Sequence, residues 1–102
     1  MSLLHDAFAR AKSENRAALI AYLPAGYPSE DGAVECIAAM VEGGVDIVEI
    51  GFPYSDPVMD GPTIQDAVNI SLEGGTKSAT VISTVKRVAE LGVPALVMSY
   101  WN

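Results

Sequence analysis

The segment VDIVEIG at residues 45–51 carries the strongest structural signal in the chain. Apart from Asp46, Glu49 and Gly51, every position in it holds Val or Ile, the β-branched residues that strands favour. A run that is apolar on both faces is typical of a strand buried inside a parallel sheet. Residues 45–51 are therefore predicted to form a buried strand.

Two further apolar runs, at residues 17–23 and 95–100, predict one strand before this segment and one after it. The run at 17–23 predicts a strand buried on both faces. Elsewhere the apolar spacing changes to that of amphipathic helices, which are expected over residues 2–14, from Ser29 to Gly43, from Pro62 to Gly74 and from Ser78 to Gly92. Strands that alternate with helices imply right-handed crossovers and a parallel sheet, and hence an α/β fold.

The predicted helices carry recognisable caps and apolar stripes. Ser29 and Ser78 each stand where the side chain of an N-cap residue would accept a hydrogen bond from the first turn. In the first helix, Leu4, Phe8 and Ala11 form the stripe that is expected to pack against the sheet.

Three strands are few for a parallel sheet, whose faces need helices and whose edges need neighbouring strands. Apolar strands left at such edges would favour aggregation. We therefore expect residues 1–102 to be the N-terminal portion of a larger α/β protein. The alternative is an intact small domain of three strands.

The chain has 102 residues, with 6 Lys and Arg against 13 Asp and Glu, and a formal net charge of −7 at pH 7. Binding to nucleic acid or to an anionic membrane needs clustered basic side chains, and the few Lys and Arg here are scattered. No apolar run approaches the ~20 residues of a membrane-spanning helix, and the N-terminus does not resemble a secretory signal. A single Cys cannot form an internal disulfide, so a cytoplasmic setting is expected.

Glu49 is the most informative single residue. Alternation along residues 45–51 places it on one face with Ile47, opposite Val48 and Ile50. A carboxylate near the C-terminal end of a parallel strand points toward the edge at which α/β proteins bind their ligands. Glu49 is therefore a candidate general acid and base. The alternative is a structural carboxylate bonded to a neighbouring strand or a backbone N–H.

The loop over residues 51–62 adds Ser55, Asp56 and Asp60 close to Glu49 in the sequence. Two or three carboxylates at a strand end could act as an acid/base pair or as oxygen ligands to Mg²⁺. The structural alternatives are a turn at Asp56 before a proline and a turn at Asp60 before the next helix. Spacing alone does not decide between acid/base chemistry and metal binding.

Tyr22 and Met98 lie near the ends of the first and third predicted strands, where they could form the wall of a pocket for an aromatic ligand. Packing in the apolar core is the more frequent role for such residues. His5 and Cys36 have no partner at the spacing of a zinc site or of an activated nucleophile, so no such site is expected.

The run EIGFPYSDPVMDGPTIQ at residues 49–65 resembles the signature stretch of the tryptophan synthase α chain family, and its combination of residues at these offsets is highly specific. PAGYP at residues 24–28 is similar to the family's first loop, and MSYWN at residues 98–102 to the end of its third strand. The resemblance spans essentially the whole chain but only about the first third of the family's barrel. It implies that residues 1–102 are a partial TIM-barrel domain, the N-terminal helix and first three strands of a (β/α)8 barrel that takes roughly 250 residues.

The resemblance also implies a reaction, the retro-aldol cleavage of indole-3-glycerol phosphate to indole and glyceraldehyde 3-phosphate. Glu49 matches the family's acid/base, which protonates the indole ring at C3 and handles the hydroxyl proton of the breaking side chain. Asp60 matches the carboxylate that faces the indole N–H. Tyr22 stands where the family usually has an aromatic residue against the indole, and Met98 is a further candidate for the same wall.

For partners, the resemblance implies a β subunit, with two α and two β chains in the complex, and a contact through the loop that holds Pro53, Asp56 and Pro57. It implies no cofactor in the α chain and pyridoxal phosphate in the β subunit, which receives the indole. The family binds the substrate phosphate on loops after later strands, so the chain as given is expected to be too short to be active alone. The alternative is an inactive fragment that serves only as a binding module for the β subunit.

Overall fold

The computed structural model describes residues 2–56 and 59–100. Its elements follow the predicted order of helix, strand, helix, strand, two helices and strand. The helices are α1 (Leu3–Ser13), α2 (Glu30–Glu42), α3 (Pro62–Glu73) and α4 (Ser78–Ala89), and the strands are β1 (Ile20–Pro24), β2 (Ile47–Gly51) and β3 (Ala95–Met98). No helix in this described part of the chain is long and apolar enough to cross a membrane.

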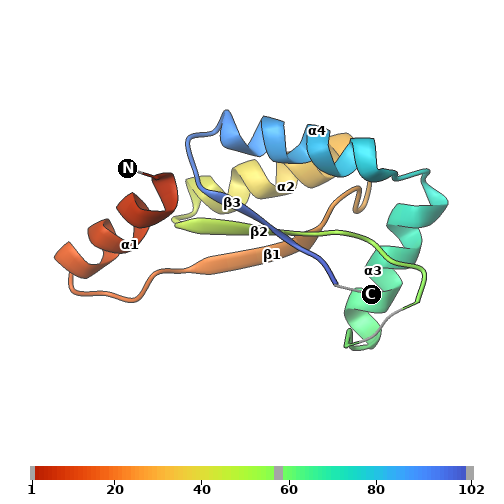
Figure 1. Cartoon of the computed structure of the whole chain (residues 1–102), viewed down its shortest axis with the longest axis horizontal. Helices are drawn as coiled ribbons and strands as arrows, with labels where there is room; N and C mark the ends of the chain where they lie inside the picture. Colours follow the sequence, from red (N-terminus) through yellow and green to blue (C-terminus); the bar gives the residue numbers. More distant parts are fainter. Residues whose placement is uncertain (1, 57–58, 101–102) are drawn as a thin grey trace.

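The strands form a parallel sheet in the order β1-β2-β3, so that β2 lies in the middle (Figure 1). Glu49 on β2 lies opposite Tyr22 on β1 and Leu96 on β3. Because register partners in a parallel sheet present their side chains to the same face, these three residues share one face. The predicted parallel sheet is therefore confirmed, and its register brings residues from all three strands together.

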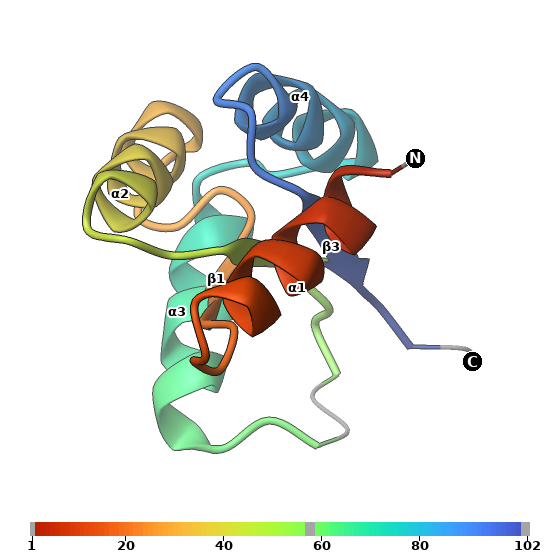
Figure 2. The same ribbon diagram turned by 90° about the vertical axis from the view of Figure 1, so that its left-hand side faces the viewer.

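The opposite face of the sheet is covered by α2 and α4, which lie next to each other above it (Figures 1 and 2). Val48 and Ile50 of β2 are fully buried in the apolar core, together with Ile37 of α2 and Val88 of α4. Burial of apolar side chains of this size contributes about 1.5–3 kcal/mol each. This layer therefore determines which face of β2 is left for Glu49.

The outer strands are less buried than the sequence predicted. β1 begins at Ile20 rather than at residue 17, and Leu19 and Ile20 are 55% and 47% exposed. β3 ends at Met98 rather than at residue 100, and it is also largely exposed. Both are edge strands with a neighbouring strand on one side only, which leaves apolar surface open. The prediction that the first strand is buried on both faces is therefore wrong, whereas the buried character of β2 is confirmed.

Two details of the helices also differ from the prediction. α1 buries Ala11, but Phe8 from the expected apolar stripe is 49% exposed. Figure 2 shows α1 in front of the end at which the strands begin. The buried residues of α1 are the small Ala7 and Ala11. At the start of α4, Ser78 is already inside the helix and Lys77 takes the N-cap position. Ser29 caps α2 as predicted.

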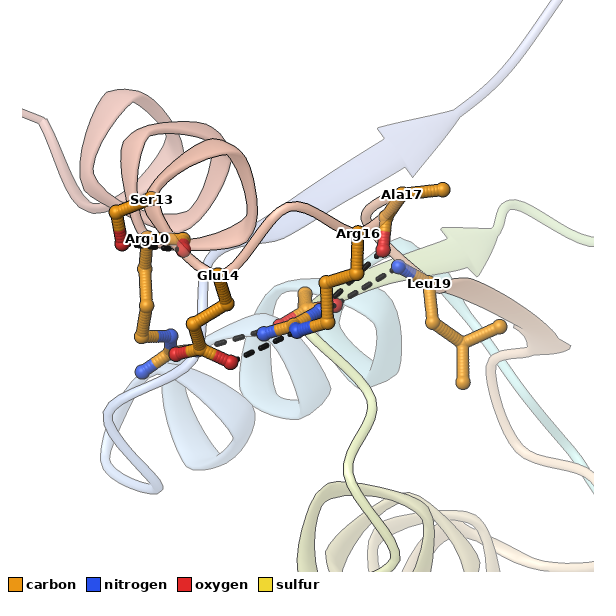
Figure 3. A network of polar contacts seen from close by, with 7 residues as sticks. Arg10, Ser13, Glu14, Arg16, Ala17 and Leu19 are labelled. Atoms are coloured by element: carbon orange, nitrogen blue, oxygen red, sulfur yellow. Dashed lines mark hydrogen bonds and ion pairs between the residues drawn. The ribbon is translucent and has the colours of Figure 1, made fainter.

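A polar network at Asp46, directly before β2, joins α1 and the start of β1 to the central strand. The carboxylate is 2% exposed and accepts hydrogen bonds from the Arg16 guanidinium at 2.8 and 3.0 Å and from the backbone N–H of Leu19 at 2.8 Å. Arg10 of α1 approaches it at 3.4 Å, and Figure 3 shows both arginines at this junction. The bonds from Arg16 and Leu19 hold the pKa of Asp46 well below its usual range.

At the other end of the sheet, the loop after β1 is joined to the end of α3. Ser71 is fully buried and donates a hydrogen bond to the Ala25 carbonyl at 2.6 Å, and its hydroxyl lies 2.9 Å from that of Thr76. Gly26 adopts a φ of +79°, and a side chain there would collide with Ser71 and Thr76. This junction, named here the Ser71 corner (Ala25, Gly26, Ser71 and Thr76), fixes the path of the chain beyond β1.

Candidate active site

Glu49 lies on the face of the sheet that α2 and α4 leave uncovered. Because Val48 and Ile50 point into the core, the alternation along β2 turns Glu49 to the other side. It is half-buried between Tyr22 and Leu96 and stands two residues before the end of β2. The structure thus places Glu49 near the carboxyl end of the sheet, as the alternation predicted.

Tyr22 lies beside Glu49 and reaches across to the next residue of β2 on the same face, Gly51. A Cβ at Gly51 would collide with the Tyr22 hydroxyl and ring, so the ring rests directly on the glycine backbone. Burial raises the pKa of Tyr22, and the charges of Asp60 and Glu49 add to this effect, as does Tyr100. The phenol is therefore neutral at physiological pH and lies within electrostatic reach of both carboxylates.

Asp60 enters the site from the loop between β2 and α3. Its side chain is half-buried, and its Oδ1 accepts a hydrogen bond from the Tyr100 hydroxyl at 3.0 Å. Its backbone carbonyl accepts a second hydrogen bond from Gln65 Nε2 of α3 at 2.7 Å. Asp60 is therefore held through both its main chain and one carboxylate oxygen.

Aromatic rings connect the loop after β2 to the chain that follows β3. The ring centroids of Phe52 and Tyr54 are 5.2 Å apart, and those of Tyr54 and Tyr100 are 5.4 Å apart. The Tyr54 hydroxyl also donates to the backbone carbonyl of Tyr100 at 3.4 Å. Tilted aromatic pairs at these separations add to the packing, so this stack holds Tyr100 against the loop that carries Asp60.

Two cavities border the site. The smaller, of about 100 Å³, is lined by polar and apolar side chains around Asp60: Tyr54, Ser55, Gln65, Val68 and Asn69. The larger, of about 340 Å³, is a groove between β1 and α3 with Tyr22 in its wall. It lies in the size range of small-molecule sites, so Tyr22 borders both the carboxylates and a surface that could receive an apolar ligand.

The remaining predicted site residues are less closely grouped. Met98 pairs with Gly51 at the end of β3, on the same face as Glu49, and is 45% exposed. Pro53 is buried in the loop after β2, and Asp56 is exposed farther along it. Pro57 lies outside the described residues.

The described residues also bear on the magnesium alternative. Within residues 2–56 and 59–100, no group of three or more His, Cys, Asp or Glu side chains is arranged to hold a metal ion. Glu49, Asp56 and Asp60 are thus not brought together as a set of oxygen ligands. The grouping of Tyr22 with Glu49 and Asp60 instead favours acid/base chemistry beside an aromatic wall.

Sequence reasoning missed Tyr100, Tyr54 and Gly51 as parts of this site. Tyr100 follows Met98 by two residues, so strand alternation would have placed both on one face. The glycine follows Glu49 by two residues and could have been recognised in the same way. The pairing of Tyr54 with Tyr100 bridges 46 residues and has no signal in a single sequence.

The sequence model of the family described as tryptophan synthase alpha chain matches residues 8–102. The tryptophan synthase alpha chain of Streptomyces coelicolor is 55% identical over 103 residues, which cover 100% of this chain and 38% of that relative. The alpha chain of Thermobifida fusca is 51% identical over 102 residues, with the same coverage. The chain therefore spans about 38% of the length of these curated relatives.

Solved structures agree with the sequence comparison. A chain of the aminoacrylate-bound form of tryptophan synthase from Mycobacterium tuberculosis superposes with a TM-score of 0.93 at 46% identity, covering 100% of this chain and 42% of that chain. The tryptophan synthase alpha chain of Legionella pneumophila gives a TM-score of 0.89 at 27% identity, covering 100% of this chain and 38% of that chain. These neighbours are TIM barrels, so the prediction of the N-terminal part of such a barrel is confirmed.

Proposed function

The chain belongs to the tryptophan synthase alpha chain family, and from this membership we propose that residues 1–102 supply the proton-transfer groups of an indole-3-glycerol phosphate lyase. The proposal rests on one observation: Tyr22, from another strand, lies beside Glu49 and within electrostatic reach of Asp60 at the carboxyl end of the sheet. The reaction breaks the bond between C3 of the indole and the glycerol phosphate side chain. Its products are indole and glyceraldehyde 3-phosphate.

Glu49 handles both protons of this retro-aldol step. In its acid form it delivers a proton to C3 of the indole, which turns a poor leaving group into one that leaves readily. The resulting carboxylate then accepts the proton of the side-chain hydroxyl, while the carbon–carbon bond breaks and its electron pair returns to the ring. One proton is given and one is taken up, so Glu49 ends in the form in which it began.

Asp60 stabilises the positive charge that protonation at C3 places on the ring. A carboxylate facing the ring N–H is most effective where water is excluded and the group is already oriented. The half-buried position of Asp60, with its main chain held by Gln65, supports this role. Asp60 therefore acts on the charged intermediate more strongly than on the neutral substrate.

Tyr22 and Met98 form the wall against which the indole lies. Tyr22 supplies an aromatic face beside both carboxylates, and Met98 supplies a flexible apolar side chain from the opposite strand. The groups that hold the substrate phosphate belong to the part of the relatives that this chain does not span. Residues 1–102 are thus a partial TIM-barrel domain with the proton-transfer half of the site.

The partner in this proposal is a β subunit that holds pyridoxal phosphate and takes up the indole. The relatives' structures of tryptophan synthase support such a partner. The loop from Pro53 through Asp56 provides the contact, because it projects beyond the carboxyl end of β2 with Asp56 exposed. Both chains work in the cytoplasm.

The test joins residues 1–102 to the remaining segment of the Streptomyces coelicolor alpha chain, which gives an enzyme of the relatives' full length, called here the completed chain. Indole release from indole-3-glycerol phosphate is measured for this protein and for its Glu49→Gln variant. We expect the substitution to lower kcat by about 10²–10⁴-fold, the usual contribution of a general acid/base. Glu42→Gln, at an exposed carboxylate at the end of α2, is the matched control and leaves kcat unchanged.

An unchanged rate in the Glu49→Gln variant would show that Glu49 is not the acid/base. The alternative function, a binding module for the β subunit, predicts a different pattern. In that case the 102-residue chain binds the β subunit, and Glu49→Gln changes neither this binding nor the indole release of the completed chain.

A further inference from the structure

We propose that Tyr100 is a positioning residue that fixes the carboxylate of Asp60 for the reaction. The inference rests on the proposed function of Asp60 and adds to it a residue that acts through Asp60 rather than on the substrate. Three features of the structure carry it: a hydrogen bond, the support of the Tyr100 ring, and the protonation state of the phenol.

The hydrogen bond runs from the Tyr100 hydroxyl to Oδ1 of Asp60 at 3.0 Å and joins the chain after β3 to the loop before α3. A bond from a neutral donor to a carboxylate is among the stronger hydrogen bonds in proteins. It restrains rotation of the carboxylate about its terminal torsion and leaves Oδ2 available for a ligand N–H. Since Gln65 holds the main chain of the same residue, both the position and the orientation of the carboxylate are fixed.

Tyr100 is itself supported, which a positioning residue requires. Its ring packs at 5.4 Å against Tyr54, which packs in turn against Phe52 at 5.2 Å. The Tyr54 hydroxyl donates to the main-chain carbonyl of Tyr100. The donor to Asp60 is thus held by a stack of rings on the loop after β2 and is not a free surface tyrosine.

The phenol is in the right protonation state to donate. Burial and the hydrogen bond to Asp60 raise the pKa of Tyr100, with a smaller contribution from Tyr54. Tyr22 lies near enough for Tyr100 to add to the rise in its pKa, of which burial is the largest cause. The Tyr100 phenol is therefore a neutral donor throughout the physiological range.

The first test measures kcat and KM of the completed chain with Tyr100→Phe, which keeps the ring and removes the hydroxyl. We expect kcat to fall by roughly tenfold, the effect of one hydrogen bond to a charged group, with KM changed by less than about twofold. Ser78→Ala is the control, since it removes an exposed hydroxyl from α4, which covers the opposite face of the sheet. It leaves kcat within about twofold of the parent.

A double-mutant cycle with Asp60→Asn distinguishes a positioning role of Tyr100 from a merely structural one. If Tyr100 acts through Asp60, Tyr100→Phe causes no further loss of kcat in the Asp60→Asn background. A loss of the same factor in both backgrounds would overturn the positioning role and leave the role of Asp60 intact. An Asp60→Asn enzyme as active as the parent would overturn the proposed function of Asp60 and the positioning role together.

A second measurement does not depend on activity. Ultraviolet titration of tyrosine ionisation compares the completed chain with its Asp60→Asn variant. Loss of the carboxylate should move the ionisation of Tyr22 and of Tyr100 to lower pH, and Tyr100→Phe should remove the second of these transitions. A titration curve that Asp60→Asn leaves unchanged would contradict the contact on which the proposal depends.

Discussion

The ring of Tyr22 on β1 lies directly over Gly51 on β2, so that the backbone of one strand forms the floor beneath a side chain of the next. This contact brings the Tyr22 hydroxyl toward the carboxyl end of the sheet, where burial and the charges of Asp60 and Glu49 raise its pKa. The position of Tyr22 in the site therefore depends on the lack of a side chain at Gly51.

Gly51→Ala should therefore disturb the site and the fold together. The added Cβ would lie 2.6 Å from a ring carbon of Tyr22, which forces the ring or the strand to move. Overpacking of this kind costs about 1–3 kcal/mol, and we expect a matching loss in the free energy of unfolding by urea, with lower kcat in the completed chain. Gly61→Ala is the control, because its Cβ would meet nothing within 4 Å. Equal effects of the two substitutions would contradict the contact.

Asp46→Asn should lower the thermal midpoint of unfolding by several degrees. The change removes the charge that two Arg16 nitrogens and the Leu19 N–H surround, and it leaves those donors partly unpaired. Glu14→Gln removes a different partner of Arg16, at 2.9 Å and on the exposed surface. Because exposed ion pairs contribute little, Tm should barely change in that control. Circular dichroism measures both, and a Tm equally unaffected in the two variants would count against the network.

The stability that Asp46 contributes should depend on pH with a definite sign. Its pKa is lower in the folded protein than in the unfolded chain, where an aspartate titrates near ~3.9. The contribution is therefore complete above that value and is lost as pH falls below it, since the unfolded state then takes up a proton first. The gap in Tm between the parent and Asp46→Asn should narrow from pH 5 toward pH 3, values that bracket ~3.9. A gap that widens in this range would show the opposite shift.

Ser71→Ala should weaken the Ser71 corner. The hydroxyl is fully buried and satisfies the Ala25 carbonyl, so its removal leaves a buried acceptor unpaired at a cost of about 1–3 kcal/mol. Ser78→Ala, at an exposed residue of α4, should change the free energy of unfolding by less than about 0.5 kcal/mol. Urea unfolding of both variants distinguishes a structural corner from an incidental contact.

The fold was largely predictable because its signals are local. The Val and Ile of β2 and the Ser29 cap of α2 are short patterns whose physical causes lie within a few residues. The exposure of Ile20 and Phe8 was not predictable in the same way. Burial at a sheet edge or on a terminal helix depends on which other elements lie against it, and a pattern along the chain does not contain that information.

In the candidate site, too, the features with a local sequence signal were predictable and those that depend on tertiary contacts were not. Alternation within one strand was sufficient to place Glu49, and the resemblance of the loop to a family motif pointed to Asp60. The hydrogen bond from Tyr100 to Asp60 spans 40 residues and exists only because the loops after β2 and β3 finish at the same edge of the sheet. Tertiary hydrogen bonds of this kind leave no trace in the spacing of residues.

Asp46 lies directly before β2 and Glu49 two residues before its end, only three positions apart in the sequence. One end of the strand anchors the fold through charge, and the other end carries the carboxylates of the candidate site, a division known from barrels of this kind. Under the proposed function, thermal tolerance and turnover are set by different groups of residues. Adaptation to a warmer or colder habitat can then proceed through the arginines around Asp46 while the proposed reaction is left unchanged.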